Sequence, residues 1–480
     1  MSHTVEKIGG TSMSRWQDVL SNIWLRPQTS ADGQTSLYNR AFVVSAYAGI
    51  TNGLLEHKKT GEAGVYALFA GSSDKTPWAE KLHAVEHHML TINADMFGSD
   101  DVSRRRADQF LQERIADAEH CLKHLEAVCS FGHFQLDDHL HTVREMLSAI
   151  GEAHSAFNSV QLLKSHGVNA RFVDLTNWRS DSQMSLDEHI AHAFADVDFA
   201  NEMPIVTGYT QCREGLMRTF DRGYSEMTFS KIATITNARE AVIHKEYHLS
   251  TADPMLVGAD NVHPIGQTNF DVADQLANLG MEAIHPRAAA GLRKQNILLR
   301  VKNTFEPEHS GTVIHNDYVS DTPKVEIIAG TRNVWAIEVF DQDMVGDAGY
   351  GQRMNDLVFD AGVRVLTKDF NANTVTFYLH GHKRTINLLM ERLRQAYPQA
   401  DIRSEKLAMV CALGSDMKVP GLLHKAAGAL SSVGVNILAV HQAMRQVDMM
   451  FLVSDADYSV AVQALHKQLI ETSEQWKEVG

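Results

Sequence analysis

Lys7-Ile8-Gly9-Gly10-Thr11-Ser12 is the stretch of sequence that says most about the fold, because it follows a short predicted strand and has the composition of a phosphate-binding turn. Two adjacent glycines let backbone N–H groups approach an anion with no Cβ in the way. The lysine adds a positive charge, and the two hydroxyls add hydrogen-bond donors. Taken alone, Gly-Gly-Thr-Ser is also typical of an ordinary turn, so the rest of the chain must decide between the two interpretations.

The N-terminal two thirds of the chain alternate short apolar runs with helical patterns, which predicts an α/β sandwich over residues 1–315. The runs at 41–46, 170–174, 203–208 and 297–301 are typical of strands, and most of them end in small or polar residues. Ligand sites in parallel sheets gather at such carboxyl ends.

Between residues 79 and 165 the pattern becomes helical. Apolar residues recur at spacings of 4, 3, 4 and 3, at Leu111, Ile115, Ala118, Leu122 and Leu125. A stripe of about two heptads predicts a helical hairpin with a core-facing side rather than a long coiled coil.

The chain changes character near residue 320, where two units of similar size begin. Each unit offers strand, helix, strand, strand and helix, with a repeat of about 70 to 75 residues. We therefore expect two ferredoxin-like (βαββαβ) modules, at 325–400 and 401–480.

The charge of the chain argues against several partners. Among its 480 residues, 44 Lys and Arg stand against 59 Asp and Glu, a formal net charge of -15. This excess of negative charge opposes nonspecific attraction to nucleic acid or to an anionic membrane. Any bound phosphate must therefore be held by a local site.

The cysteines and histidines indicate no metal site. The four cysteines lack a close metal-ligand pair and are expected to be reduced thiols, at Cys121, Cys129, Cys212 and Cys411. The 25 histidines have no zinc-like spacing with cysteine or aspartate. Because neither a signal-peptide core nor an 18-residue apolar run occurs, we expect a cytoplasmic protein.

Seven collinear segments resemble the aspartate kinases. The stretch from Lys7 to Ser12 is similar to their Lys-Phe-Gly-Gly-Thr-Ser opening, with Ile8 in the aromatic position. The others lie at 43–52, 151–155, 206–209 with 221–226, 250–254, 284–287 and 300–304, and the two C-terminal modules look like ACT domains. The resemblance implies an amino-acid-kinase fold and transfer of the γ-phosphoryl group of ATP, with Mg²⁺, to L-aspartate. The product would be 4-phospho-L-aspartate, which leads to lysine, threonine and methionine. Residues 244–250 and 280–286 look most like the aspartate kinases associated with ectoine biosynthesis.

The resemblance also implies roles for individual residues. The acceptor carboxylate is already ionised at neutral pH, so the site must align two anions rather than supply a general base. Lys7 would neutralise the transferring phosphoryl group, Arg222 would clamp the aspartate carboxylate, and Glu152 would accept from the substrate ammonium or orient Lys7. Glu226 stands where the family usually has the shorter aspartate. Neutral donors to the substrate would come from Thr51 and Ser225, and the nucleotide would meet Lys7, Gly9, Gly10, Ser12, Ser45, Lys245 and Ser250.

The nucleotide side departs from the family pattern. His244-Lys245-Glu246-Tyr247-His248 replaces the usual Thr-Asp-Val-Asp-Gly, and Met255 and Glu282 stand where the family has cations. Our hypothesis is that Lys245 partly restores the missing positive charge, with Mg²⁺ bridging the phosphates.

In the first ACT module, residues 343–350 resemble the loop where family members hold an effector. Lysine or threonine would then bind near Asp343, Met344, Gly346 and Tyr350, with Asp343 or Asp347 near its ammonium. The alternative is that both modules mainly build a homodimer or a higher homo-oligomer. Two other functions stay open: a kinase for a related carboxylate such as glutamate, and a catalytically silent amino-acid sensor.

Overall fold

A computed structural model describes the chain except for residues 1–2, 30–32, 34, 59, 72–75, 181–182, 221–222, 282–283, 347–348 and 473–480. The chain forms two compact units, Met1–His248 with Ile284–Asn316, and Leu249–Ala283 with Asp317–Gly480. Within the described residues, no helix combines the length and apolar character needed to cross a membrane.

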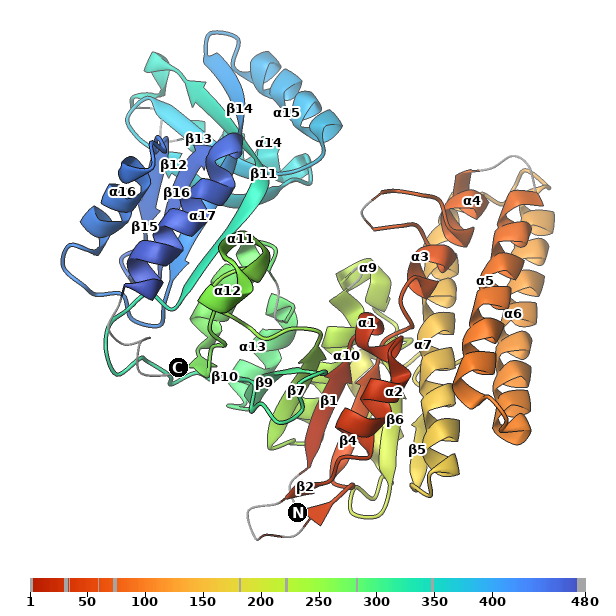
Figure 1. The fold of residues 1–480 in the computed structure, drawn as a ribbon. Coiled ribbons are helices and arrows are strands. Elements are labelled where there is room, and N and C mark those ends of the chain that lie inside the picture. The colour runs from red at the N-terminus through yellow and green to blue at the C-terminus, as the bar shows by residue number, and fades with distance from the viewer. Residues whose placement is uncertain are drawn as a thin grey trace. The chain divides into compact units, whose positions relative to one another are not determined.

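The first unit is built on a mainly parallel sheet, which confirms the predicted α/β sandwich (Figure 1). Its strands run in the order β5-β6-β4-β1-β7-β9-β10, and β10 alone among them pairs antiparallel, with β9. Their bounds are β1 (Thr4–Ile8), β4 (Arg40–Val44), β5 (Ala170–Val173), β6 (Met203–Thr207), β7 (Glu240–Lys245), β9 (Leu298–Asn303) and β10 (Thr312–Ile314), beside a small ribbon of β2 (Gln28–Thr29) and β3 (Thr35–Ser36). All residues of β1, β4 and β6 are buried, as a sheet covered on both faces requires.

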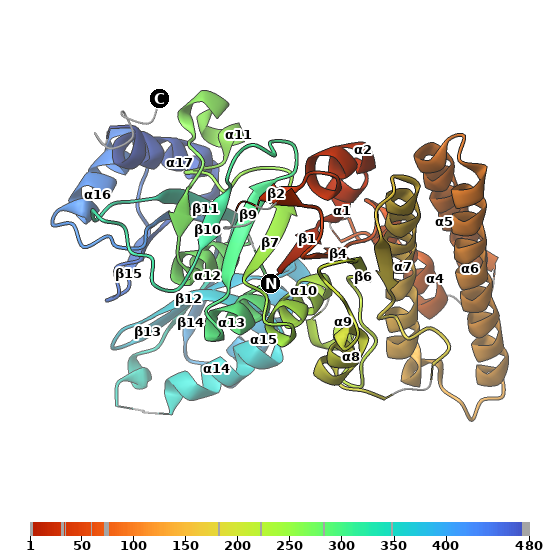
Figure 2. The ribbon, with the colours of Figure 1, turned by 90° about the horizontal axis from the view of Figure 1, so that it is seen from below.

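Helices cover this sheet and continue into a bundle beyond it. Their bounds are α1 (Gly10–Met13), α2 (Trp16–Val19), α3 (Ile50–Leu54), α4 (Val65–Gly71), α5 (Thr76–Phe97), α6 (Asp101–Cys129), α7 (Leu140–Ser165), α8 (Leu186–Phe194), α9 (Leu216–Phe220), α10 (Tyr224–Ile235) and α13 (Pro286–Lys294). The expected hairpin is formed by α5 and α6, and α7 lies along α6 as a third long helix (Figures 1 and 2). The predicted stripe on α6 is buried from Leu111 to Leu122, whereas Leu125 is only half-buried.

The second unit contains one six-stranded antiparallel sheet in the order β12-β13-β11-β14-β16-β15. Its strands are β11 (Ile327–Phe340), β12 (Arg364–Phe370), β13 (Thr374–His380), β14 (Asp401–Leu413), β15 (Ala439–Gln442) and β16 (Asp448–Ser454), with helices α14 (Tyr350–Asp360), α15 (Lys383–Ala396), α16 (Leu422–Ser432) and α17 (Tyr458–His466). The long strands β11 and β14 serve both expected modules, because the second half of β11 pairs with β13 and with the start of β14, whereas its first half pairs with the end of β14. The two modules therefore share the strands β11 and β14.

Residues 249–283 cluster with this second unit rather than with residues 1–248. They contain α11 (Pro254–Val257), β8 (Gln267–Thr268) and α12 (Phe270–Asn278). The physical reason is apolar burial: Val272 and Leu276 of α12 share a core with Ile327 and Met409.

Candidate active site

The glycine-rich turn at the end of β1 is held against the turn that follows β4. A Cβ on Gly10 would lie 2.5 Å from the carbonyl oxygen of Ala46, so no larger residue fits this close approach. The Ser45 N–H donates to the Ile8 carbonyl at 3.1 Å, which ties the ends of the two neighbouring strands together. The turn therefore lies at the carboxyl edge of the sheet.

A carboxylate already occupies the donors of this turn. The backbone N–H and the hydroxyl of Ser12 both donate to Oε1 of Glu246 at 3.1 Å. The Ser12 hydroxyl is also 3.1 Å from Oγ1 of Thr304. Three oxygen-bearing side chains thus meet at the turn, and Glu246 uses the donor pair that suits a phosphate oxygen.

Lys7 is buried among acidic side chains. Its Nζ lies 3.8 Å from Oε1 of Glu226, and the residue is 7% exposed. Burial lowers the pKa of Lys7, and the charge of Lys245 lowers it further. Three carboxylates act in the opposite direction, those of Glu226, Glu152 and Glu246. The pKa of the buried Lys7 ammonium is therefore set by several opposing charges.

Glu226, on α10, is anchored on its other side by α13. Its Oε2 accepts from the backbone N–H of His285, the N-cap of α13. The His285 ring also lies close to Gly223, where a Cβ would be 2.8 Å from it. The longer glutamate in place of the family's aspartate thus spans from Lys7 to the start of α13.

Glu152 is the most unusual carboxylate of the site. It lies on α7, is 2% exposed, and accepts a 2.7 Å hydrogen bond from the Ser225 hydroxyl on Oε1. Within the described part of the chain, the buried Oε2 has no hydrogen-bond partner. Burial raises the pKa of Glu152 to about 8, against the lowering effects of Ser225 and of the Lys7 charge. A buried acceptor without a donor is costly, so this oxygen is suited to a cationic ligand.

Gly208 makes room for this carboxyl group. A Cβ at Gly208 would lie 2.9 Å from both carboxylate oxygens of Glu152 and 2.9 Å from Cβ of Ser225. On the opposite side, Gly151 lets α7 approach the turn after β4, because a Cβ there would be 2.8 Å from Cβ of Ala46. Two glycines thus position α7 and its glutamate against the sheet edge.

The structure therefore brings together Lys7, Gly9, Gly10, Ser12, Ser45, Glu152, Ser225, Glu226 and Lys245 at or beside the carboxyl ends of the strands. Thr51 is the second residue of α3, directly after the loop that packs on α7. Ser250 is in the second unit, where it forms an isolated β-bridge with Pro264. Arg222, Glu282 and Asp347 lie outside the described residues.

The predicted effector residues divide between a cavity and the core. Asp343 and Tyr350 line a cavity of about 530 Å³ in the second unit, together with Asp341, Arg353 and Tyr397. Met344 is buried in the hydrophobic core of this module, and Gly346 has a left-handed φ of 90°.

Sequence reasoning missed Glu246, Gly208 and His285. Glu246 stands in the segment that departs from the family pattern, directly after β7, and this position at a carboxyl strand end was the available signal. Reasoning from the sequence also missed a buried group on the other face of β1, where Glu6 accepts from Arg40 at 2.6 Å and lies 2.7 Å from His244. Although burial opposes it, Arg40 and His244 lower the pKa of Glu6, which is a structural ion pair.

Comparison with known proteins identifies the family of the chain. The amino acid kinase family matches residues 3–303, and an ACT domain matches residues 410–469. Aspartate kinase Ask_Ect of Stutzerimonas stutzeri is 54% identical over 469 residues, which cover 98% of each chain. Aspartokinase 1 of Arabidopsis thaliana is 26% identical over 57% of this chain and 49% of its own.

Solved structures share the fold. Escherichia coli aspartokinase III in complex with aspartate and ADP has a TM-score of 0.69 at 20% identity, over 97% of this chain and 99% of its own. The same enzyme in complex with lysine and aspartate has a TM-score of 0.68 at 19% identity, over 98% of this chain and 99% of its own. With these relatives, the chain belongs to the amino acid kinase family and, within it, to the aspartate kinases.

Proposed function

We propose that this chain transfers the γ-phosphoryl group of ATP to the side-chain carboxylate of L-aspartate, with Glu152 as the acceptor for the substrate ammonium. The observation that carries the proposal is the buried, unpartnered Oε2 of Glu152 beside Ser225 and Lys7. An ammonium is the ligand group that best satisfies such an oxygen, because it brings both a hydrogen-bond donor and the opposite charge.

Phosphoryl transfer then needs alignment and charge neutralisation rather than a general base. The acceptor carboxylate is ionised at neutral pH, so Lys7 serves to offset the repulsion between it and the phosphoryl group. Glu226 positions Lys7 and is itself held by the His285 N–H. Arg222, as in the resemblance, would clamp a substrate carboxylate.

The nucleotide phosphates are proposed to lie at the turn of Gly9, Gly10 and Ser12, with Lys245 at its side, and there they would take the two Ser12 donors over from Glu246. Mg²⁺ prefers oxygen ligands and usually combines one or two carboxylates with substrate phosphates. The oxygens of Glu246, Ser12 and Thr304 meet this requirement, so these residues would face the ion. When bound, Mg²⁺ would neutralise charge on the phosphates.

A hydroxamate assay tests the activity directly. Mg-ATP, hydroxylamine and either L-aspartate or L-glutamate are incubated with the protein, and the trapped acyl phosphate is measured. We expect hydroxamate with aspartate and far less with glutamate. Lys7→Ala should lower kcat by a factor of about 10³, as removal of a charge stabiliser of the transition state does, while the thermal unfolding temperature stays close to that of the wild type. Absence of aspartate hydroxamate, or full activity in Lys7→Ala, would overturn the proposal.

Regulation by an amino acid is part of the same proposal. The cavity of about 530 Å³ is lined by the carboxylates of Asp341 and Asp343 and by the guanidinium of Arg353. The carboxylates suit the ammonium of an amino acid, and the guanidinium suits its carboxylate. Lysine and threonine are therefore added to the assay. Inhibition that Asp343→Asn weakens supports an effector there, and inhibition that this variant leaves unchanged places the effector elsewhere. A homodimer and a role in ectoine synthesis belong to this proposal and follow from the family resemblance.

A further inference from the structure

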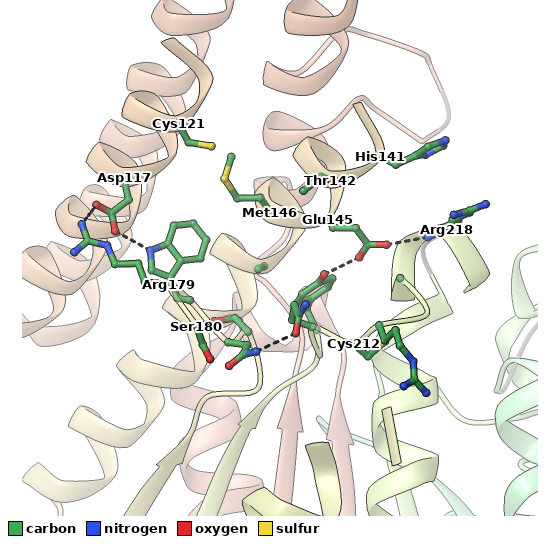
Figure 3. A pocket seen from close by; sticks show the side chains of 18 of the residues that line it. Asp117, Cys121, His141, Thr142, Glu145, Met146, Arg179, Ser180, Cys212 and Arg218 are labelled. Atoms are coloured by element: carbon green, nitrogen blue, oxygen red, sulfur yellow. Dashed lines mark hydrogen bonds and ion pairs between the residues drawn. The ribbon is translucent and has the colours of Figure 1, made fainter. Parts of the chain in front are cut away.

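A cavity in the first unit is lined by residues other than the charged groups around Lys7. Its volume is about 840 Å³, and it opens between α6, α7 and the loops that follow β5 and β6 (Figure 3). Cavities of roughly 300 to 1,000 Å³ are the usual size for small-molecule sites. Its lining does not include Lys7, Glu152, Ser225 or Glu226.

One wall of this cavity is held in a strained conformation. Asn177 and Arg179, in the loop after β5, have left-handed φ angles of 52° and 61°. Asp117 of α6 holds the indole ring of Trp178, which stands between these two residues in the sequence. Nε1 of Trp178 donates to Asp117 at 2.8 Å, and Arg179 also pairs with Asp117 (Figure 3). The Asn177 amide donates to Gln211 at 3.1 Å. Such strain persists only where surrounding contacts hold it, and it is common at binding sites.

Three carboxylates line the cavity, and protein donors contact each of them. The exposed Glu214 accepts from the Leu186 N–H at 3.2 Å. Asp117 accepts from Trp178 and Arg179, as described above. Glu145 accepts from the Tyr209 hydroxyl at 2.6 Å and from the Arg218 N–H at 3.0 Å (Figure 3). These acids therefore offer little to a cationic ligand.

Two arginines that line the same cavity, Arg213 and Arg218, differ from its carboxylates in their contacts. Among the described residues, the guanidinium groups of Arg218 and Arg213 form no ion pair, although the charge of Arg213 acts on the exposed carboxylate of Glu188. Trp178 and Met146 supply apolar surface to the same hollow. The cavity thus combines two available guanidinium groups with an apolar wall.

We propose that this cavity binds a small organic anion with a flat apolar body, with the anionic group at Arg213 and Arg218 and the body against Trp178 and Met146. Guanidinium groups bind carboxylate, sulfonate or phosphate oxygens with paired hydrogen bonds. The site is separate from the aspartate site but adjacent to it. Tyr209 lines the cavity with its side chain, and its backbone N–H helps to lower the pKa of Glu152. This inference goes beyond the proposed kinase activity and does not depend on it.

A fluorescent organic anion, 8-anilinonaphthalene-1-sulfonate, is a suitable probe, because its emission rises when it leaves water. Titration of the full chain should show a saturable site. The double variant Arg213→Ala/Arg218→Ala should weaken binding at least about tenfold, the effect of losing one charge-assisted hydrogen bond. Met146→Trp, which fills the cavity, should weaken it as well, and Arg105→Ala on the exposed face of α6 should not.

Two outcomes would overturn the proposal. One is unchanged probe binding in the double arginine variant, which alters exposed side chains and is expected to fold. The other is competitive displacement of the probe by saturating L-aspartate with Mg-ATP, which would make the cavity part of the substrate site. Retention of the probe with both substrates present supports a separate site, and this result is independent of whether the kinase assay succeeds.

Discussion

Replacing Glu152 by glutamine should abolish a proton release that accompanies aspartate binding. Burial raises the pKa of Glu152 to about 8, so about nine tenths of this carboxyl group is protonated at pH 7 in the free enzyme. An opposite charge within hydrogen-bond reach lowers a carboxyl pKa by about 1 to 3, and the middle of that range reverses the protonation at pH 7. Binding of the substrate ammonium should therefore expel roughly 0.8 proton per aspartate.

Calorimetric titration with L-aspartate at pH 7, repeated in buffers of different ionisation enthalpy, measures this number. Glutamine keeps the shape of the side chain but cannot lose a proton, so the variant should release almost none. It also lacks the charge-assisted hydrogen bond, worth about 1.5 to 3 kcal/mol, so KM for aspartate should rise about 10- to 150-fold. Glu113→Gln, at an exposed position of α6, is the matched control. Equal proton release in wild type and Glu152→Gln would refute the assignment.

Three further predictions concern the same site. The pKa of Glu152 is higher in the folded than in the unfolded chain, so the stability that this group contributes is complete at low pH and is lost as pH rises towards 8. Between pH 5 and 8 the free energy of unfolding of Glu152→Gln should therefore rise relative to wild type by a few kcal/mol, at about 1.4 kcal/mol per pH unit. A difference that does not change with pH would contradict the burial of this charge. Gly208→Ala places a Cβ 2.9 Å from the Glu152 carboxylate and should lower kcat/KM for aspartate about 100-fold in the hydroxamate assay. Gly428→Ala is the control, because a Cβ there meets open space, and it should leave kcat/KM unchanged. Lys245→Ala should raise KM for Mg-ATP several-fold with KM for aspartate preserved, and an unchanged KM for ATP would show that Lys245 does not replace the missing cations.

The fold class could be predicted because its signals are local. Short apolar runs ending in small or polar residues marked β4, β5, β6 and β9, and the structure confirms them within one or two residues at most ends. The glycine-rich turn at Lys7 was recognisable for the same reason. Two adjacent glycines indicate a backbone that can approach an anion closely, and the lysine beside them supplies a positive charge.

Domain limits were harder to predict. The repeat of strands and helices after residue 320 is real, but it gave no sign that β11 and β14 run through both modules in one sheet. Residues 249–283 join the second unit because the apolar face of α12 is covered there, and a helix pattern alone does not state which core covers it.

The sequence by itself determined the family, the sheet and the residues with chemical potential, because these depend on composition and on short periodic patterns. Only the tertiary structure decided which of them meet. Glu246 contacts Ser12, 234 residues earlier in the sequence, because β7 pairs in parallel with β1. Glu152 is buried because α7 packs at Gly151 against the turn that follows β4. Strand order and helix packing set these contacts, and with them the raised pKa of Glu152 and the lowered pKa of Lys7, which no local pattern encodes.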